Sequence, residues 1–222
     1  MKHGLYWRGS ALLVLGYLTG TPHPPEAAAS PPMVALDTPA PLAPAPEIAP
    51  APQCDGGQDS PPEVVASTAR QLSSRHIAYR SQPMSDCSGM FHRVLQSLHS
   101  RCDDILGPTP EQARSSDAIA RWYDDQGALH RVRTPEQADP WLVPGAILFY
   151  ATPGARGDLA AIHHVGVVVD VVRDAQDRVD SYRLFHGRQP GLTATITSHH
   201  TRDNRPALGN GPDALVAIAS AW

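Results

Sequence analysis

Residues 85–98, SDCSGMFHRVLQSL, join a helix start to an apolar helix face, and the rest of the chain is organised around them. Apolar residues recur at steps of three and four in the second half of this stretch, which predicts an amphipathic helix. Ser85 and Asp86 are favoured N-cap residues, so Cys87 falls in the first turn. Free backbone N–H groups and the positive end of the helix dipole stabilise a thiolate there. The stretch alone leaves two interpretations open, a reactive thiol and a small apolar residue beside a cap.

The N-terminal part of the chain has the features of an export signal followed by a spacer. Residues 1–29 begin with positive charge and contain the apolar core ALLVLGYL, which is too short to span a bilayer as a stable helix. Cleavage after Gly20 and cleavage near residues 27–29 both fit, and an uncleaved anchor is the alternative. Residues 30–60 are rich in Pro and Ala, which predicts an extended linker without a packed core. We therefore expect an exported protein of the periplasm, cell envelope or medium, with no stable membrane insertion after signal removal.

The net charge of the chain argues against one class of partner, and the number of cysteines predicts how they are paired. The chain of 222 residues has a net charge of −4 and no basic run, so nucleic acid is not an expected partner. Three cysteines in an exported protein suggest one pair and one free thiol. We expect Cys54 and Cys102 to form a disulfide, which leaves Cys87 free; the alternative is two unpaired thiols.

Residues 61–222 have the composition of one globular domain in which helices precede strands. Helical patterns cover residues 63–75, 87–102 and 111–127. Strand patterns cover residues 146–150, 165–172, 179–185, 193–197 and 214–219. Residues 128–145, with three prolines, look irregular. This order predicts an α+β fold with N-terminal helices packed on a mainly antiparallel β-sheet.

Two histidines near strand ends are candidates for the base that a cysteine nucleophile requires. His164 lies where the strand of residues 165–172 begins, and His186 lies where the next strand ends. A hairpin of these strands would make the two histidines neighbours, so that one could orient the ring of the other. Gly166 would allow another element to approach closely. His163, directly before His164, is the alternative base.

The other histidines give weaker signals. His92 and His99 lie a heptad apart in the predicted cysteine helix and are expected to face solvent. His199 and His200 are expected in a polar loop without the ligand spacing of a zinc site. We therefore expect no metal site and no cofactor.

Taken together, these motifs resemble the NlpC-type cysteine peptidases, which are papain-like bacterial enzymes that cut peptidoglycan stem peptides. The resemblance covers about residues 62–190, in the family's order. It rests on DCSG at 86–89, HVG at 164–166 and FHG at 185–187. PGAILF at 144–149 is also similar to the family's strand before the histidine. The resemblance implies a papain-like, NlpC-type domain over residues 61–222.

The resemblance also implies a Cys-His-His triad. Cys87 would be the nucleophile, His164 the base, and His186 the residue that orients His164. Tyr79 matches the tyrosine ahead of the cysteine loop, whose hydroxyl would help to stabilise the oxyanion beside the Cys87 backbone N–H.

Substrate contacts follow from the same motif. Asp86 and Ser88 match positions that hold the substrate amine in family members cutting after a free N-terminal L-Ala-D-Glu. RSQ at 80–82 replaces the family's Gly-Gly pair, and the stretch before residue 146 is long, so the bond cut is not specified. We expect a monomeric cysteine-type endopeptidase, a hydrolase whose substrate is a peptidoglycan peptide. The alternatives are an amidase or acyltransferase on the same scaffold, and a non-catalytic wall-binding module that has kept the fold.

Overall fold

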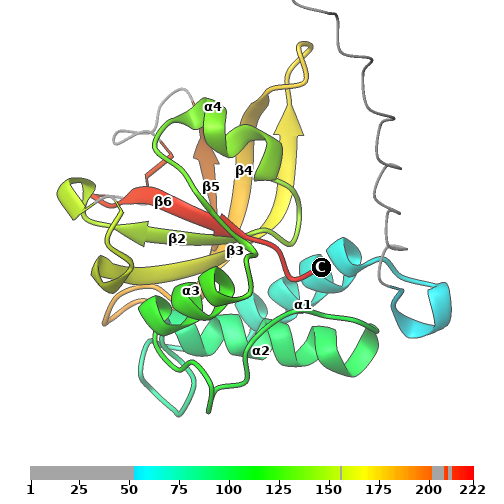
Figure 1. Cartoon of the computed structure of the whole chain (residues 1–222). Coiled ribbons are helices and arrows are strands. Elements are labelled where there is room, and N and C mark those ends of the chain that lie inside the picture. Colours follow the sequence, from blue (N-terminus) through cyan, green and yellow to red (C-terminus); the bar gives the residue numbers. More distant parts are fainter. Residues whose placement is uncertain (1–52, 156, 202–207, 210–211) are drawn as a thin grey trace, which may run out of the picture. The chain divides into compact units, whose positions relative to one another are not determined.

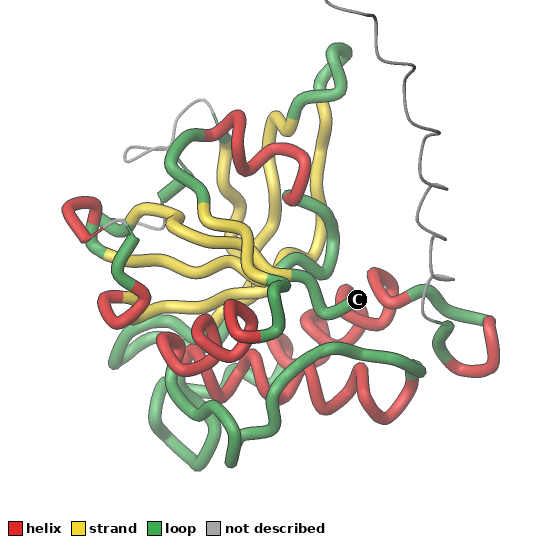
Figure 2. Tube along the Cα trace, in the orientation of Figure 1, coloured by secondary structure: helices red, strands yellow, loops and turns green. Residues whose placement is uncertain are grey.

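The computed structural model describes residues 53–155, 157–201, 208–209 and 212–222. The predicted signal peptide and most of the predicted linker therefore lie outside the described residues. Within them the chain folds as an α+β unit, in which four α-helices flank a six-stranded antiparallel sheet (Figures 1 and 2).

The longest helix begins at the predicted residue, Cys87, and the next longest begins at Pro61, two residues before the predicted start at residue 63. The α-helices are α1 Pro61–Ser74, α2 Cys87–Arg101, α3 Ser116–Asp125 and α4 Pro135–Ala138. The short 3-10 helices are η1 Asp55–Gly57, η2 Asp139–Trp141, η3 Pro153–Ala155 and η4 Leu159–Ala161. Glu63 accepts hydrogen bonds from the N–H and hydroxyl of Ser60 and so caps α1. The predicted apolar faces of α1 and α2 are both buried.

The strands form one sheet whose neighbours all run antiparallel. They are β1 Leu129–Arg131, β2 Ile147–Ala151, β3 Ile162–Arg173, β4 Val179–His186, β5 Thr195–His200 and β6 Ala214–Ala219. Their order across the sheet is β1-β6-β2-β3-β4-β5. The prediction of a mainly antiparallel sheet is confirmed, as is the hairpin of β3 and β4.

The sheet is buried on both faces, with α1, α2 and α3 on one side and α4 on the other (Figure 1). Strand β2 shows the reason, because successive side chains of a strand point to opposite faces. Ile147 and Phe149 pack into the core beneath the three longer helices. Leu148 and Tyr150 pack into a second core with Ala138 of α4. A strand buried on both faces needs an unbroken apolar run, which is what the sequence has here.

Residues 53–60 of the predicted linker are attached to the folded unit. Cys54 and Cys102 form the expected disulfide, which joins this segment to the end of α2. Arg101 pairs with Asp55 at 2.5 Å and with Asp59 at 2.6 Å, and both contacts hold the same segment.

The third helix is shorter than predicted. Helix α3 begins at Ser116 rather than at residue 111, because residues 109–113 close a separate turn on the Thr109 carbonyl. Ile119 of this helix is buried, and Ala118 and Trp122 are half-buried and pack against the core.

Three further predictions were wrong. Residues 128–145 contain β1 and α4, and Thr134 with Pro135 supplies a good helix start there. His92 is buried rather than exposed, because its ring hydrogen-bonds to the Ala113 carbonyl at 2.7 Å. His199 and His200 lie in β5 rather than in a loop.

Candidate active site

Cys87 is the first residue of α2, and its neighbours fix that position. The Asp86 carboxylate accepts a hydrogen bond from the Gly89 N–H at 2.8 Å and so caps the helix. Gly89 is required because a Cβ there would lie 2.3 Å from the carbonyl carbon of Met84 in the preceding loop. With the other two cysteines in the disulfide, Cys87 carries the free thiol of the chain.

The Cys87 side chain lies at the boundary between the helix-side core and a cavity. It is 7% exposed, and it lines a cavity of about 520 Å³. Its Sγ lies 3.4 Å from Ser116 Oγ and 3.8 Å from the His163 carbonyl oxygen. The thiol therefore sits directly against the backbone of β3, one residue before His164.

The hairpin of β3 and β4 brings His164 and His186 together as predicted. His164 is the third residue of β3, and His186 is the last residue of β4. His164 Nε2 lies 2.8 Å from His186 Nδ1, and the two rings meet edge to face. Both histidines line the same cavity as Cys87.

A glycine lets the end of β4 approach the start of α2. A Cβ on Gly187 would lie 2.8 Å from the Asp86 carbonyl and from the Cys87 nitrogen. Two backbones are thus in contact at this point, which only a residue without a side chain permits. Gly166, which the sequence singled out for close approach, faces the Leu184 side chain instead. Gly187 therefore does for the site what was predicted for Gly166.

Burial keeps both imidazoles neutral. It lowers the pKa of His164 from 6.5 to about 4, and the Asp213 carboxylate only partly opposes this. Burial also lowers the pKa of His186, and the charges of His164, His199 and Arg188 lower it further. A neutral imidazole retains a lone pair, which is the form that can accept a proton from a thiol.

His163 is differently placed from His164. Its Nδ1 lies 3.1 Å from the Ala161 carbonyl, and its Nε2 lies 3.1 Å from Asp213 Oδ2. His163 lines the same cavity as Cys87 and His164, but both of its ring nitrogens already have partners. This arrangement favours His164 over His163 as a base for Cys87.

Tyr79 lines the cavity together with Cys87. Its backbone N–H donates to the Leu192 carbonyl at 3.0 Å, which ties the cysteine loop to the segment before β5. Burial raises the pKa of the Tyr79 phenol, and the charge of Cys87 raises it further. The hydroxyl therefore stays protonated and can donate a hydrogen bond in the cavity.

Asp86 and Ser88 are both bound to an arginine that the sequence analysis did not single out. Arg114 Nη2 lies 3.0 and 3.1 Å from the two Asp86 carboxylate oxygens, and its Nη1 lies 2.6 Å from Ser88 Oγ. Burial alone would raise the pKa of Asp86, but the Gly89 N–H and Arg114 outweigh it and lower the pKa. Neither Asp86 nor Ser88 is among the described residues that line the cavity of Cys87. Their predicted contact with a substrate amine stays a prediction.

Three more residues near the site were missed. Ser116 is buried beside the Cys87 sulfur, and Thr197 and His199 continue the hydrogen bonding beyond His186. A strand assignment for residues 195–200 would have placed Thr197 and His199 on one face, because they are two residues apart. The sequence carries no comparable signal for Ser116.

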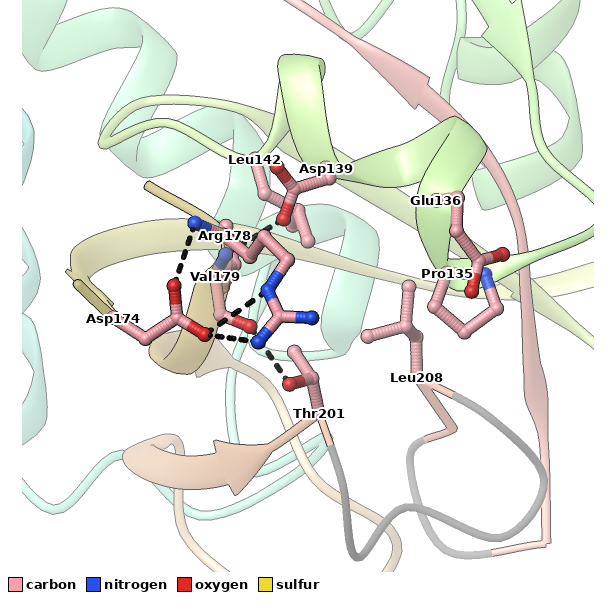
Figure 3. Close-up of a pocket in the computed structure, with 9 residues that line it drawn as sticks. All are labelled: Pro135, Glu136, Asp139, Leu142, Asp174, Arg178, Val179, Thr201 and Leu208. Atoms are coloured by element: carbon pink, nitrogen blue, oxygen red, sulfur yellow. Dashed lines mark hydrogen bonds and ion pairs between the residues drawn. The ribbon is translucent and has the colours of Figure 1, made fainter. Parts of the chain in front are cut away.

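A second cavity of about 430 Å³ lies beside α4 (Figure 3). Two of its charged residues bind each other, since Arg178 pairs with Asp174 at 2.8 Å, and a third, Asp139, accepts a hydrogen bond from the Val179 backbone N–H at 2.6 Å. These contacts close the β3–β4 turn and attach η2 to the sheet. The described residues that line the second cavity therefore include no thiol beside an imidazole, which is the pair found at Cys87.

Two further kinds of feature are absent from the described part of the chain. It contains no cluster of three or more His, Cys, Asp or Glu residues placed to hold a metal ion. None of its helices has the length and apolar character needed to cross a membrane.

No protein-family model matches the chain, and comparison with curated proteins finds none that is significantly similar. What can be stated is the class that fold and geometry define. This is an α+β protein in which a free thiol at a helix start shares a cavity with two hydrogen-bonded, neutral imidazoles.

Proposed function

We propose that the chain is a cysteine peptidase with a papain-like domain of the NlpC type, acting on peptide amide bonds of bacterial cell-wall stem peptides. One observation carries the proposal: the Cys87 thiol lies against the His163 carbonyl, and the next residue, His164, is hydrogen-bonded to His186 in the same cavity. The order of these residues matches the motifs that resemble the family.

The proposed reaction uses groups already described. His164 Nε2 faces His186, so Nδ1 is the ring nitrogen that accepts the proton of the Cys87 thiol. The sulfur attacks the amide carbonyl carbon, and the Cys87 N–H with the Tyr79 hydroxyl stabilises the oxyanion. His164 then gives its proton to the leaving amine as the C–N bond breaks, and water hydrolyses the thioester.

In the substrate-free arrangement Cys87 contacts Ser116 and the His163 carbonyl. Hydrogen bonds of catalytic groups often tighten only when substrate binds, so this contact pattern is compatible with the proposal. It also predicts that the thiol turns from Ser116 toward His164 when a peptide enters the cavity.

The disulfide supports an exported location. Disulfides form and persist in oxidising compartments, and a Cys54–Cys102 bridge agrees with the signal-like N-terminus. We propose that the protein works as a monomer outside the cytoplasm.

The test is mass spectrometry of purified stem peptides incubated with the full chain and with its Cys87→Ala variant. We expect two new peptide termini at one amide bond with the native chain and none with the variant. Cleavage that persists in Cys87→Ala contradicts the mechanism. Hydrolysis or transfer of acyl-amide substrates, with stem peptides left intact, favours the amidase or acyltransferase alternative.

A further inference from the structure

A line of hydrogen bonds leads from His164 through β4 and into β5. His186 Nδ1 bonds to His164, and its other ring nitrogen, Nε2, lies 3.0 Å from Thr197 Oγ1. The same hydroxyl lies 2.8 Å from His199 Nε2. Strands β4 and β5 pair so that Leu184 is opposite Thr197, which places both β5 residues on the face that carries His186.

The last group in this line of hydrogen bonds is a backbone carbonyl, which can accept a hydrogen bond but cannot donate one. Burial lowers the pKa of His199, and a hydrogen bond to the Gly209 backbone partly opposes this. A backbone group that raises the pKa of an imidazole is one that accepts its proton, the carbonyl. The ring also stacks on Tyr182 with ring centroids 5.1 Å apart. Because Nε2 faces Thr197, the nitrogen that donates to Gly209 is Nδ1. A carbonyl oxygen has no proton to give, so its partner must carry one.

This fixed end sets the direction of every other hydrogen bond. A neutral His199 with a proton on Nδ1 has a bare Nε2, which accepts the Thr197 hydroxyl proton. The Thr197 oxygen then accepts from His186 Nε2–H, and His186 Nδ1 is left bare to accept from His164 Nε2–H. Burial lowers the pKa of all three imidazoles, so each carries a single ring proton.

This direction determines whether the other ring nitrogen of His164, Nδ1, carries a proton. With its one proton on Nε2, His164 has a bare Nδ1. In the reverse direction His164 would carry its proton on Nδ1, and it could not accept a proton from a thiol.

We propose that Thr197 and His199 are positioning residues that hold His164 in the tautomer with a bare Nδ1, the form that a base needs. The role of that tautomer in catalysis rests on the proposed peptidase function, whereas the proton order itself does not. Neither residue touches the reacting atoms, and both act through His186.

Nitrogen-15 NMR of the imidazoles in the full chain tests the proton order without any substrate. We expect His164 and His186 as Nε2–H tautomers and His199 as the Nδ1–H tautomer, assigned from single His→Gln variants. An Nδ1–H tautomer at His186 or His164 in the native chain overturns the proposal.

Substitutions in β5 test whether the order is imposed from there. Thr197→Val and His199→Phe remove the hydrogen bonds while keeping the shape of the site and the stack on Tyr182. We expect His164 to become a mixture of tautomers, and the rate of Cys87 alkylation by iodoacetamide to fall roughly tenfold or more, since base catalysis contributes about 10²–10⁴-fold. Thr197→Ser and His199→Gln, which keep an acceptor or donor in place, should restore both readouts.

The matched control is Ser198→Ala, an exposed position of the same strand that faces the other way. It should change neither the tautomers nor the alkylation rate. An unchanged His164 tautomer in folded Thr197→Val contradicts the proposal. If the native tautomers are as expected but stem peptides are not cut, the proton order stands and the peptidase proposal fails.

Discussion

Two cavities of similar volume differ in what their polar groups are bonded to. Beside α4, Arg178 and Asp174 bind each other across the β3–β4 turn, and this ion pair lines a cavity of about 430 Å³ (Figure 3). Around Cys87, a cavity of about 520 Å³ is lined by the thiol and by a hydrogen-bonded pair of imidazoles. Among the described residues, the second ring nitrogen of His164 has no partner. The two cavities therefore differ in the polar atoms that remain free to bind a ligand, and this property, rather than volume, distinguishes a candidate active site.

The difference between the two cavities is tested most directly by removing one side chain from each and comparing the loss of activity. His164→Ala should lower kcat/KM for stem peptides by about 10²–10⁴-fold, the range that a general base contributes. Arg178→Ala should stay within about twofold, because exposed ion pairs contribute little. Steady-state kinetics on one defined peptide measures both variants. Equal losses would show that the two cavities do not differ in the way proposed.

The sequence was sufficient for features that depend on local patterns. The capped apolar helix after Asp86, the buried strand at 147–151 and the β3–β4 hairpin all carry their own periodicity, and the structure has them. The neighbouring positions of His164 and His186 followed from that hairpin.

The features that were missed depend on contacts between distant segments. Arg114 binds Asp86 across 28 residues, and it lies in the segment before α3 that the sequence assigned to a longer helix. His92 was predicted to face solvent because it is polar. It is buried because its ring hydrogen-bonds to the carbonyl of Ala113, 21 residues away, and this contact could not be predicted from the local pattern. The strand predicted at residues 193–197 is present but extends to His200, and its polar second half could be recognised only from its pairing with β4.

Removal of the disulfide should lower the stability of the fold without changing the reactivity of Cys87. Replacing Cys54 and Cys102 together by serine should lower the free energy of unfolding by about 2–5 kcal/mol, as expected when a native bridge is removed. Neither cavity includes these residues. Urea unfolding should therefore show the loss while the alkylation rate of Cys87, measured well below the transition, is unchanged. A parallel fall in that rate would mean that the bridge also holds the start of α2.

A smaller effect is expected at the contact between β4 and α2. Gly187→Ala would place a Cβ 2.8 Å from backbone atoms of Asp86 and Cys87, so these elements must move apart. Overpacking of this kind costs about 1–3 kcal/mol, and we expect slower Cys87 alkylation as well. Gly154→Ala is the matched control, because a Cβ there meets nothing within 4 Å. Thermal unfolding and alkylation of both variants measure the difference.

A change of pH should affect the stability of one cavity only. His164 has an ordinary pKa of 6.5 when unfolded and about 4 when folded, and burial lowers the pKa of His186 in the same direction. As pH falls through 6.5 the unfolded chain gains protons that the folded chain does not, so stability decreases toward about pH 4. The charged and titratable groups facing this pair are His163, His199, Asp213 and Arg188.

Each such proton changes the free energy of unfolding by ~1.4 kcal/mol per pH unit. His164→Gln should therefore reduce the slope between about pH 6.5 and about pH 5 by roughly one proton, measured by urea unfolding at several pH values. Asp174→Asn in the cavity beside α4 is the control. The hydrogen bond from Arg178 lowers the pKa of Asp174 from 3.8, so its stabilising contribution is lost only as pH falls below that value. It should leave the slope unchanged. An unchanged slope in His164→Gln would mean that His164 is protonated in the folded chain, and a protonated imidazole cannot serve as the base for Cys87.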